Sequence, residues 1–143
     1  MSKFCKENGF IVAKKVDKSE KYLTKLFVCS KLMQASFLTY GDILLVNATY
    51  RTNKYKLPLV IFSGFTYKGR NCIFDIGIVN DEKETTYNWL FGQFRLIHKV
   101  LPQIVGSDHD LAIASLMANA YKGIICLLCL WHIEQNLKKQ LMI

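Results

Sequence analysis

A short apolar run that ends abruptly narrows the possible folds of this sequence more than any other segment. Residues 43–46 are all apolar, and Asn47, Ala48 and Thr49 follow them before a basic turn at residues 51–56. Such a short run beside turn signals is typical of a buried strand rather than of a helix. Ligands in α/β proteins bind where buried strands end. We therefore expect the functional residues to gather around Asn47.

The segments that follow predict a mixed sheet. Short connections join predicted strands at residues 43–48, 57–67 and 71–79, which favours an antiparallel meander. The acids at residues 81–84 indicate a helix start, and apolar residues at helical spacing continue that helix to about residue 100. The remaining pattern predicts a strand at 103–106, a helix at 113–120, a strand at 124–129 and a helix at 132–142. This β-β-β-α-β-α-β-α order predicts an α/β fold of the ribonuclease-H-like type, with a mixed five-stranded sheet and helices on both faces.

The N-terminal residues predict a smaller addition to this core. Two predicted strands, at residues 10–16 and 22–29, are separated by a polar stretch that suits a hairpin. Residues 30–40 predict a short amphipathic helix. We therefore expect an N-terminal extension over residues 1–41 and a ribonuclease-H-like core over residues 42–143.

Charge and composition restrict the function classes. Residues 1–70 carry 13 Lys and Arg against 4 acids, whereas residues 71–143 carry 6 against 7, which together give the net charge of +8. A basic half suits a polyanion such as DNA, although it also suits an ordinary solvated surface. The sequence has no secretory signal and no apolar run long enough to span a membrane. Five cysteines, mostly within apolar runs, predict reduced, buried thiols in a nuclear or cytoplasmic protein.

Carboxylates are the residues to look for at the predicted strand ends. Polynucleotidyl transfer on this fold uses two divalent cations held by acids, and Mg²⁺ and Mn²⁺ prefer oxygen ligands. Asp108 follows the strand at 103–106 and can serve as a ligand or as a helix N-cap. The first strand offers Asn47 instead of an acid. Asp42 cannot replace it, because alternation directs Asp42 to the opposite face.

Cysteine and histidine residues near the C-terminus predict no independent metal or catalytic centre. Cys126 and Cys129 are three apart in a predicted strand, so they face opposite sides and do not form a zinc knuckle. Cys129 and His132 straddle a strand-to-helix junction and can meet. A Cys–His nucleophile lacks an orienting partner, so core packing is the simpler interpretation. His98 and His109 are isolated and need no special role.

Four collinear segments resemble the transposase domain of Mutator-like elements, known as MULE. They also resemble the related plant far-red-response (FAR-RED IMPAIRED RESPONSE) family of transcription regulators. The matching residues are 42–59, 81–91, 107–112 and 129–136. The resemblance runs from about Leu26 to Leu141, and its specificity comes from the order of the segments.

The resemblance implies a metal-dependent DDE transposase core that cuts and joins DNA with Mg²⁺ or Mn²⁺. It makes Asp108 the second acid and the residual metal ligand, and it places Asn47 where the family has its first acid. Cys129 and His132 match the family's C-x-x-H signature. The third acid would follow a helical insertion beyond residue 143, so we expect the chain to lack it.

These expectations give three functional hypotheses. The chain is an inactive fragment of a transposase catalytic domain that needs no cofactor of its own, or it is a domesticated DNA-binding or regulatory module. Alternatively, a longer protein supplies the missing acid. In the first two cases DNA is the expected partner, and Arg51, Lys54 and Lys56 are the expected DNA-binding residues.

Overall fold

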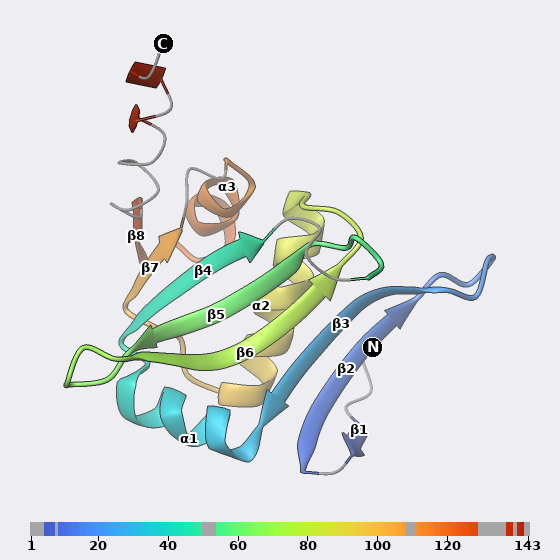
Figure 1. Ribbon diagram of the computed structural model, residues 1–143, viewed down its shortest axis with the longest axis horizontal. Helices are drawn as coiled ribbons and strands as arrows, with labels where there is room; N and C mark the ends of the chain where they lie inside the picture. Colours follow the sequence, from blue (N-terminus) through green and yellow to red (C-terminus); the bar gives the residue numbers. More distant parts are fainter. Residues whose placement is uncertain are drawn as a thin grey trace.

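The computed structural model describes residues 5–7, 9–49, 54–107, 111–128, 137–138 and 140–141. One sheet of eight strands in the order β1-β2-β3-β6-β5-β4-β7-β8 organises these residues (Figure 1). Its strands are β1 (Cys5–Glu7), β2 (Phe10–Val16), β3 (Leu23–Ser30), β4 (Ile43–Thr49), β5 (Leu59–Phe65), β6 (Asn71–Val79), β7 (Ile104–Ser107) and β8 (Ile125–Leu128). The helices are α1 (Lys31–Tyr40), α2 (Glu84–His98) and α3 (Leu111–Ala120).

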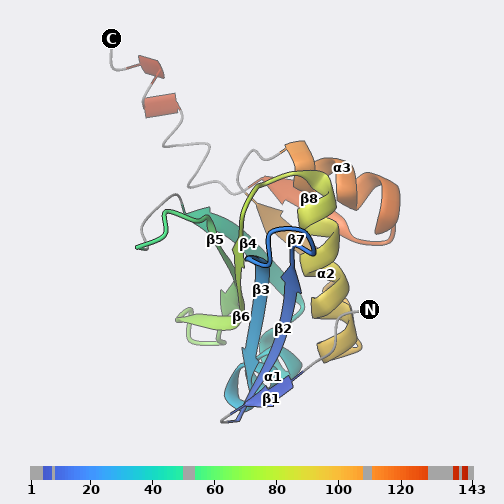
Figure 2. The same cartoon turned by 90° about the vertical axis from the view of Figure 1, so that its right-hand side faces the viewer.

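The core strands have the predicted ribonuclease-H-like arrangement. Strands β4, β5 and β6 form an antiparallel meander, while β7 lies parallel to β4 and β8 lies parallel to β7. The order β6-β5-β4-β7-β8 therefore places the first core strand in the centre. This confirms the predicted α/β, ribonuclease-H-like fold class and the element order through β8. The helices were expected on both faces of the sheet, whereas the described helices all pack on one face (Figure 2). The predicted helix at 132–142 lies mostly outside the described residues.

The N-terminal hairpin extends the same sheet. Strand β3 pairs antiparallel with β6, β2 pairs with β3, and β1 adds a short outer strand. The predicted five-stranded sheet is therefore enlarged to eight strands, because the free edge of β6 accepts the hairpin. Helix α1 then leads into β4. Its N-cap is Ser30, whose Oγ accepts a hydrogen bond from the Met33 N–H at 3.1 Å. The boundary expected near residue 41 remains a prediction.

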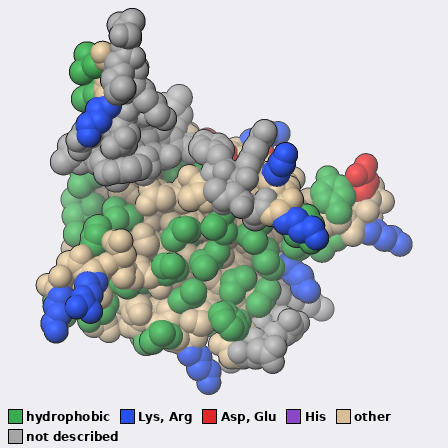
Figure 3. Space-filling view, in the orientation of Figure 1, with side chains coloured by type: hydrophobic (Ala, Val, Ile, Leu, Met, Phe, Trp, Pro, Cys, Tyr) green, Lys and Arg blue, Asp and Glu red, His purple; other side chains and the backbone are tan. Residues whose placement is uncertain are grey.

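The described helices cover one face of the sheet. Figure 2 shows α2 and α3 on the same side, with α1 near one end of the sheet. Alternation along the strands directs one set of side chains to these helices and the other set to the open face. The open face carries many hydrophobic side chains (Figure 3). They include the exposed residues Ile43, Phe65, Ile73, Ile125 and Leu127.

Aromatic side chains fill the core between the sheet and α2. Phe62 of β5 is fully buried and makes edge contacts with Phe27 and Phe91 at centroid distances of 5.6 and 5.5 Å. It also stacks on Phe94 at 5.6 Å. Phe94 and Phe91 lie three residues apart on α2, so one face of this helix presents both rings to the sheet.

An irregularity in β6 changes which side chains reach this core. Phe62 pairs with Asp75, but the next residue, Ser63, pairs with Ile73, so Phe74 is an extra residue in the ladder. This is the pattern of a β-bulge. As a result, Phe74 and Asp75 are both fully buried although they are adjacent in sequence.

None of the described helices is long and apolar enough to cross a membrane.

Candidate functional site

Asn47 lies on the open face of the central strand, near its C-terminal end. Leu44 and Val46 are fully buried on the helix-covered face, so the side chain of Asn47 faces the open side of the sheet. It pairs with Ile61 of β5. Its side-chain oxygen Oδ1 is buried and accepts no hydrogen bond from any residue that the structure describes. A buried amide oxygen without a donor is unfavourable by about 1–3 kcal/mol. The atom is therefore available to a cation or to a donor that approaches from outside.

The neighbouring strand ends at the same place. In the parallel ladder, Leu45 lies opposite Gly106 and Val46 opposite Ser107. Ser107 is buried, and a Cβ on Gly106 would lie 2.8 Å from Cδ2 of Leu45. The C-terminal ends of strands β4 and β7 therefore lie side by side at the same end of the sheet. Asp108, which follows β7, lies outside the described residues, and its position beside Asn47 remains a prediction.

The basic turn after β4 is only partly described. Lys54 and Lys56 are exposed, and Lys54 Nζ lies 5.8 Å from the centroid of the Tyr55 ring. Figure 1 places this connection at the end of the sheet that also carries the β2–β3 turn. Arg51 lies outside the described residues. The structure therefore brings Lys54 and Lys56 to the same end of the sheet as Asn47.

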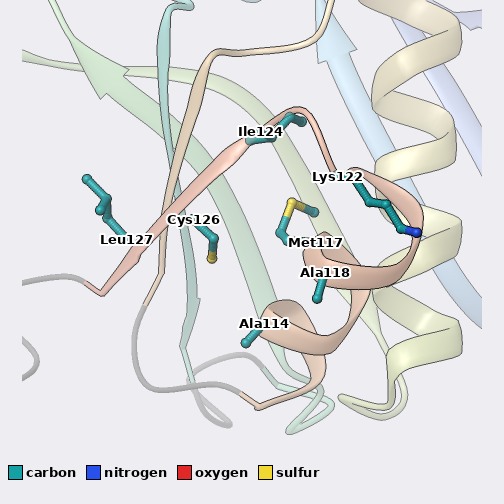
Figure 4. Close-up of a pocket in the computed structure, with 7 residues that line it drawn as sticks. All are labelled: Ala114, Met117, Ala118, Lys122, Ile124, Cys126 and Leu127. Atoms are coloured by element: carbon teal, nitrogen blue, oxygen red, sulfur yellow. The ribbon is translucent and has the colours of Figure 1, made fainter.

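The candidate residues near the C-terminus are only partly described. Cys129 and His132 lie outside the described residues. Cys126 is described and is exposed, although the sequence predicted a buried thiol. The reason is that β8 is the last strand of the described sheet. Cys126 lines a hollow of about 520 Å³ between α3 and β8 (Figure 4), which has no carboxylate among its described lining residues.

A second polar cluster lies on the helix-covered face, and the sequence did not reveal it. His98 Nε2 lies 2.8 Å from Asp75 Oδ2 and 3.0 Å from Asp75 Oδ1, and both side chains are buried. The expectation that His98 needs no special role was therefore wrong. Cys29 joins the pair, with its Sγ 3.4 Å from the Phe74 carbonyl oxygen.

Burial dominates the electrostatics of this cluster. Desolvation raises the pKa of Asp75, while the hydrogen bond from His98 and its charge act in the opposite direction. Desolvation also raises the pKa of the Cys29 thiol far above its usual range, and the nearby Asp75 adds to that shift. In the absence of a cation, Cys29 is therefore a protonated thiol.

Two plant proteins are similar to this chain over part of their length. The Arabidopsis thaliana protein FAR1-RELATED SEQUENCE 5 is 28% identical over 73% of this chain and 14% of its own length. FAR1-RELATED SEQUENCE 2 of the same plant is 21% identical over 95% of this chain and 17% of its own length. The chain thus spans less than one fifth of these relatives.

Among solved structures, the HTLV-2 integrase catalytic core domain in complex with magnesium matches 73% of this chain and 71% of that chain. Its TM-score is 0.45 at 19% identity, a similarity too low to transfer its metal to this chain. The model of the MULE transposase domain matches residues 43–136, which is more than half of the chain and includes β4 through β8. The chain therefore belongs to the MULE transposase domain family.

Proposed function

We propose that this domain is a catalytically inactive member of the MULE family that binds DNA through its basic segments. The observation that carries the proposal is Asn47, an amide at the end of the central strand, where the resemblance places the first acid. Two-metal catalysis holds a pair of divalent cations about 3.5–4 Å apart. Negative ligands must offset the repulsion between such cations, and an amide oxygen carries no net charge.

The residues present do not fit a two-cation centre. The unpartnered Oδ1 of Asn47 can serve as one neutral oxygen ligand. The other candidate ligand, Asp108, lies outside the described residues. No catalytic step through a metal is therefore assigned to this chain. We expect no cleavage of supercoiled or linear DNA in Mg²⁺ or Mn²⁺. Cleavage by the unchanged chain that is lost in Asp108→Asn would refute the proposed inactivity, and cleavage that survives Asp108→Asn would refute the role of this end of the sheet.

Restoring the carboxylate should restore cation binding. We expect Asn47→Asp, with Asp108 intact, to raise the affinity for Mn²⁺ at least about tenfold, because the new ligand carries a full negative charge. Isothermal titration calorimetry measures this change. Asn71→Asp is the matched control, since Asn71 is an exposed residue at the start of β6, where its side chain is remote from the end of β4. Equal Mn²⁺ affinities for Asn47→Asp and the unchanged chain would show that Asn47 and Asp108 are not neighbours.

DNA binding is supported by the charge distribution. The net charge is +8, and the excess of Lys and Arg lies in the first 70 residues. Exposed Lys54 and Lys56 share the end of the sheet with Asn47. Contacts between lysines and phosphates release counterions, so the affinity should fall steeply with salt concentration.

Lys54→Gln/Lys56→Gln should weaken binding to duplex DNA several-fold and reduce the slope of log affinity against log salt by about 1.8. Fluorescence anisotropy over a salt series measures both quantities. Lys68→Gln/Arg70→Gln removes the same charge from the exposed β5–β6 turn at the opposite end of the sheet (Figure 1). If both double variants have the same effect, binding follows total charge and the proposed surface is wrong. If the unchanged chain does not bind duplex DNA at low salt, the proposed DNA-binding function is refuted.

A further inference from the structure

Three potential metal ligands meet where β3, β6 and α2 pack together. The Cys29 sulfur, an Asp75 carboxylate oxygen and a His98 ring nitrogen all lie within 4.8 Å of one another, and all three residues are buried. In a tetrahedral Zn²⁺ site, two ligand atoms that share the metal lie about 3.3–3.6 Å apart. The three atoms therefore have nearly the spacing that a zinc ion requires. The fourth tetrahedral position falls to a water molecule or to the Phe74 carbonyl oxygen, which lies 3.4 Å from Cys29 Sγ.

The surroundings fix the ligands in place. The His98 ring lies between the rings of Phe37 and Phe94, at centroid distances of 4.4 and 4.5 Å. Asp75 pairs with the buried Phe62 and therefore faces the core, and the bulge in β6 adds the buried Phe74 beside it. Ligands held by packing lose little conformational entropy when they bind a metal.

Charge and ligand chemistry both favour zinc over the hard cations. A thiolate, a carboxylate and a neutral imidazole around one divalent ion have no net charge, which is the arrangement that burial penalises least. Binding releases the proton of the Cys29 thiol. Sulfur and imidazole ligands suit Zn²⁺, whereas Mg²⁺ and Ca²⁺ prefer oxygen alone.

We propose that Cys29, Asp75 and His98 form a structural Zn²⁺ site that clamps the N-terminal hairpin to the transposase core. This site is distinct from the strand end at Asn47, because Asn47 lies on the open face of the sheet and the cluster lies on the face covered by α2. Its ligands come from the extension, from the meander and from the helix after it. Burial excludes substrate, so the ion is structural, and it enters while the chain folds.

The test is the metal content of the full chain purified from cells grown with added zinc or, in a second culture, with cobalt. Elemental analysis should find about one zinc per chain. The cobalt form should show the intense near-ultraviolet absorption of a thiolate–cobalt bond. Both signals should disappear in Cys29→Ala and in His98→Gln.

Two control variants separate this site from the other cysteines. Cys126→Ala removes an exposed thiol, and Cys129→Ala/His132→Ala removes the C-x-x-H signature. Both variants should keep the metal and the absorption band. Loss of either signal in a control variant, with retention in Cys29→Ala, assigns the metal elsewhere and overturns the proposal.

Measurements on the unchanged chain also decide the question if Cys29→Ala fails to fold. A folded chain from zinc-supplemented cells that contains no zinc overturns the proposal. So does a chain that refolds from denaturant to the same melting temperature with Zn²⁺ as with a chelator, because a bound ion must stabilise the folded state. A higher melting temperature after refolding with Zn²⁺ supports it.

Discussion

Phe62→Ala should lower the free energy of unfolding by about 3–5 kcal/mol, the range for removing a buried aromatic ring from a packed core. Phe62 is fully buried and contacts the rings of Phe27, Phe91 and Phe94. These partners belong to β3 and to α2. The substitution therefore loosens the hairpin, the meander and the helix together, and the remaining rings cannot collapse into the space without moving the sheet.

Urea denaturation followed by circular dichroism measures this change. Phe65→Ala is the matched control, because Phe65 lies on the same strand, three residues away, and is 48% exposed. It should lower the free energy of unfolding by about 1 kcal/mol or less. Equal losses for the two variants would mean that the helix-covered face is not the principal core.

His98→Leu should also destabilise the chain strongly, by about 3–5 kcal/mol at neutral pH in the presence of a chelator. The substitution leaves the carboxylate of Asp75 fully buried without its partner at 2.8 Å. Desolvation of that charge causes the loss, since leucine itself packs well between Phe37 and Phe94. The chelator ensures that the measurement reports the Asp75–His98 pair rather than a bound metal.

The double variant Asp75→Leu/His98→Leu provides the decisive comparison. It removes the buried charge together with its partner, so it should recover most of the stability that His98→Leu loses. Chemical denaturation of His98→Leu, Asp75→Leu and the double variant gives the coupling energy. Strictly additive losses would show that the two side chains contribute independently, and the buried pair would then have no energetic coupling.

Local patterns in the sequence predicted most of the core. The apolar runs of β4 and β5 and the helical spacing in α2 arise from burial on one face, which is a local property. The position of the N-terminal hairpin was not predictable in the same way. Its pairing with β6 depends on an edge formed by residues more than 40 positions later in the chain, and β1 has only 3 residues.

The candidate site was predicted only in part for a similar reason. Asn47 was found because it ends an apolar run, and it lies near the C-terminal end of β4. His98 was not linked to Asp75, because 23 residues separate them and the bulge cancels the normal alternation of β6. Cys126 was expected to be buried, because an apolar run does not show whether its strand lies at the edge of the sheet.

The bulge at Phe74 gives the buried polar cluster a neighbour that a regular ladder would not supply. Deletion of Phe74 would leave Phe62–Asp75 and Ser63–Ile73 as consecutive pairs, so Asp75 would keep its place on the helix-covered face. The cluster would keep its three side chains, but it would lose the Phe74 carbonyl oxygen that lies 3.4 Å from Cys29 Sγ and the buried ring that contacts Phe37. A related sequence one residue shorter in this strand would therefore retain the cluster in a less tightly packed surrounding.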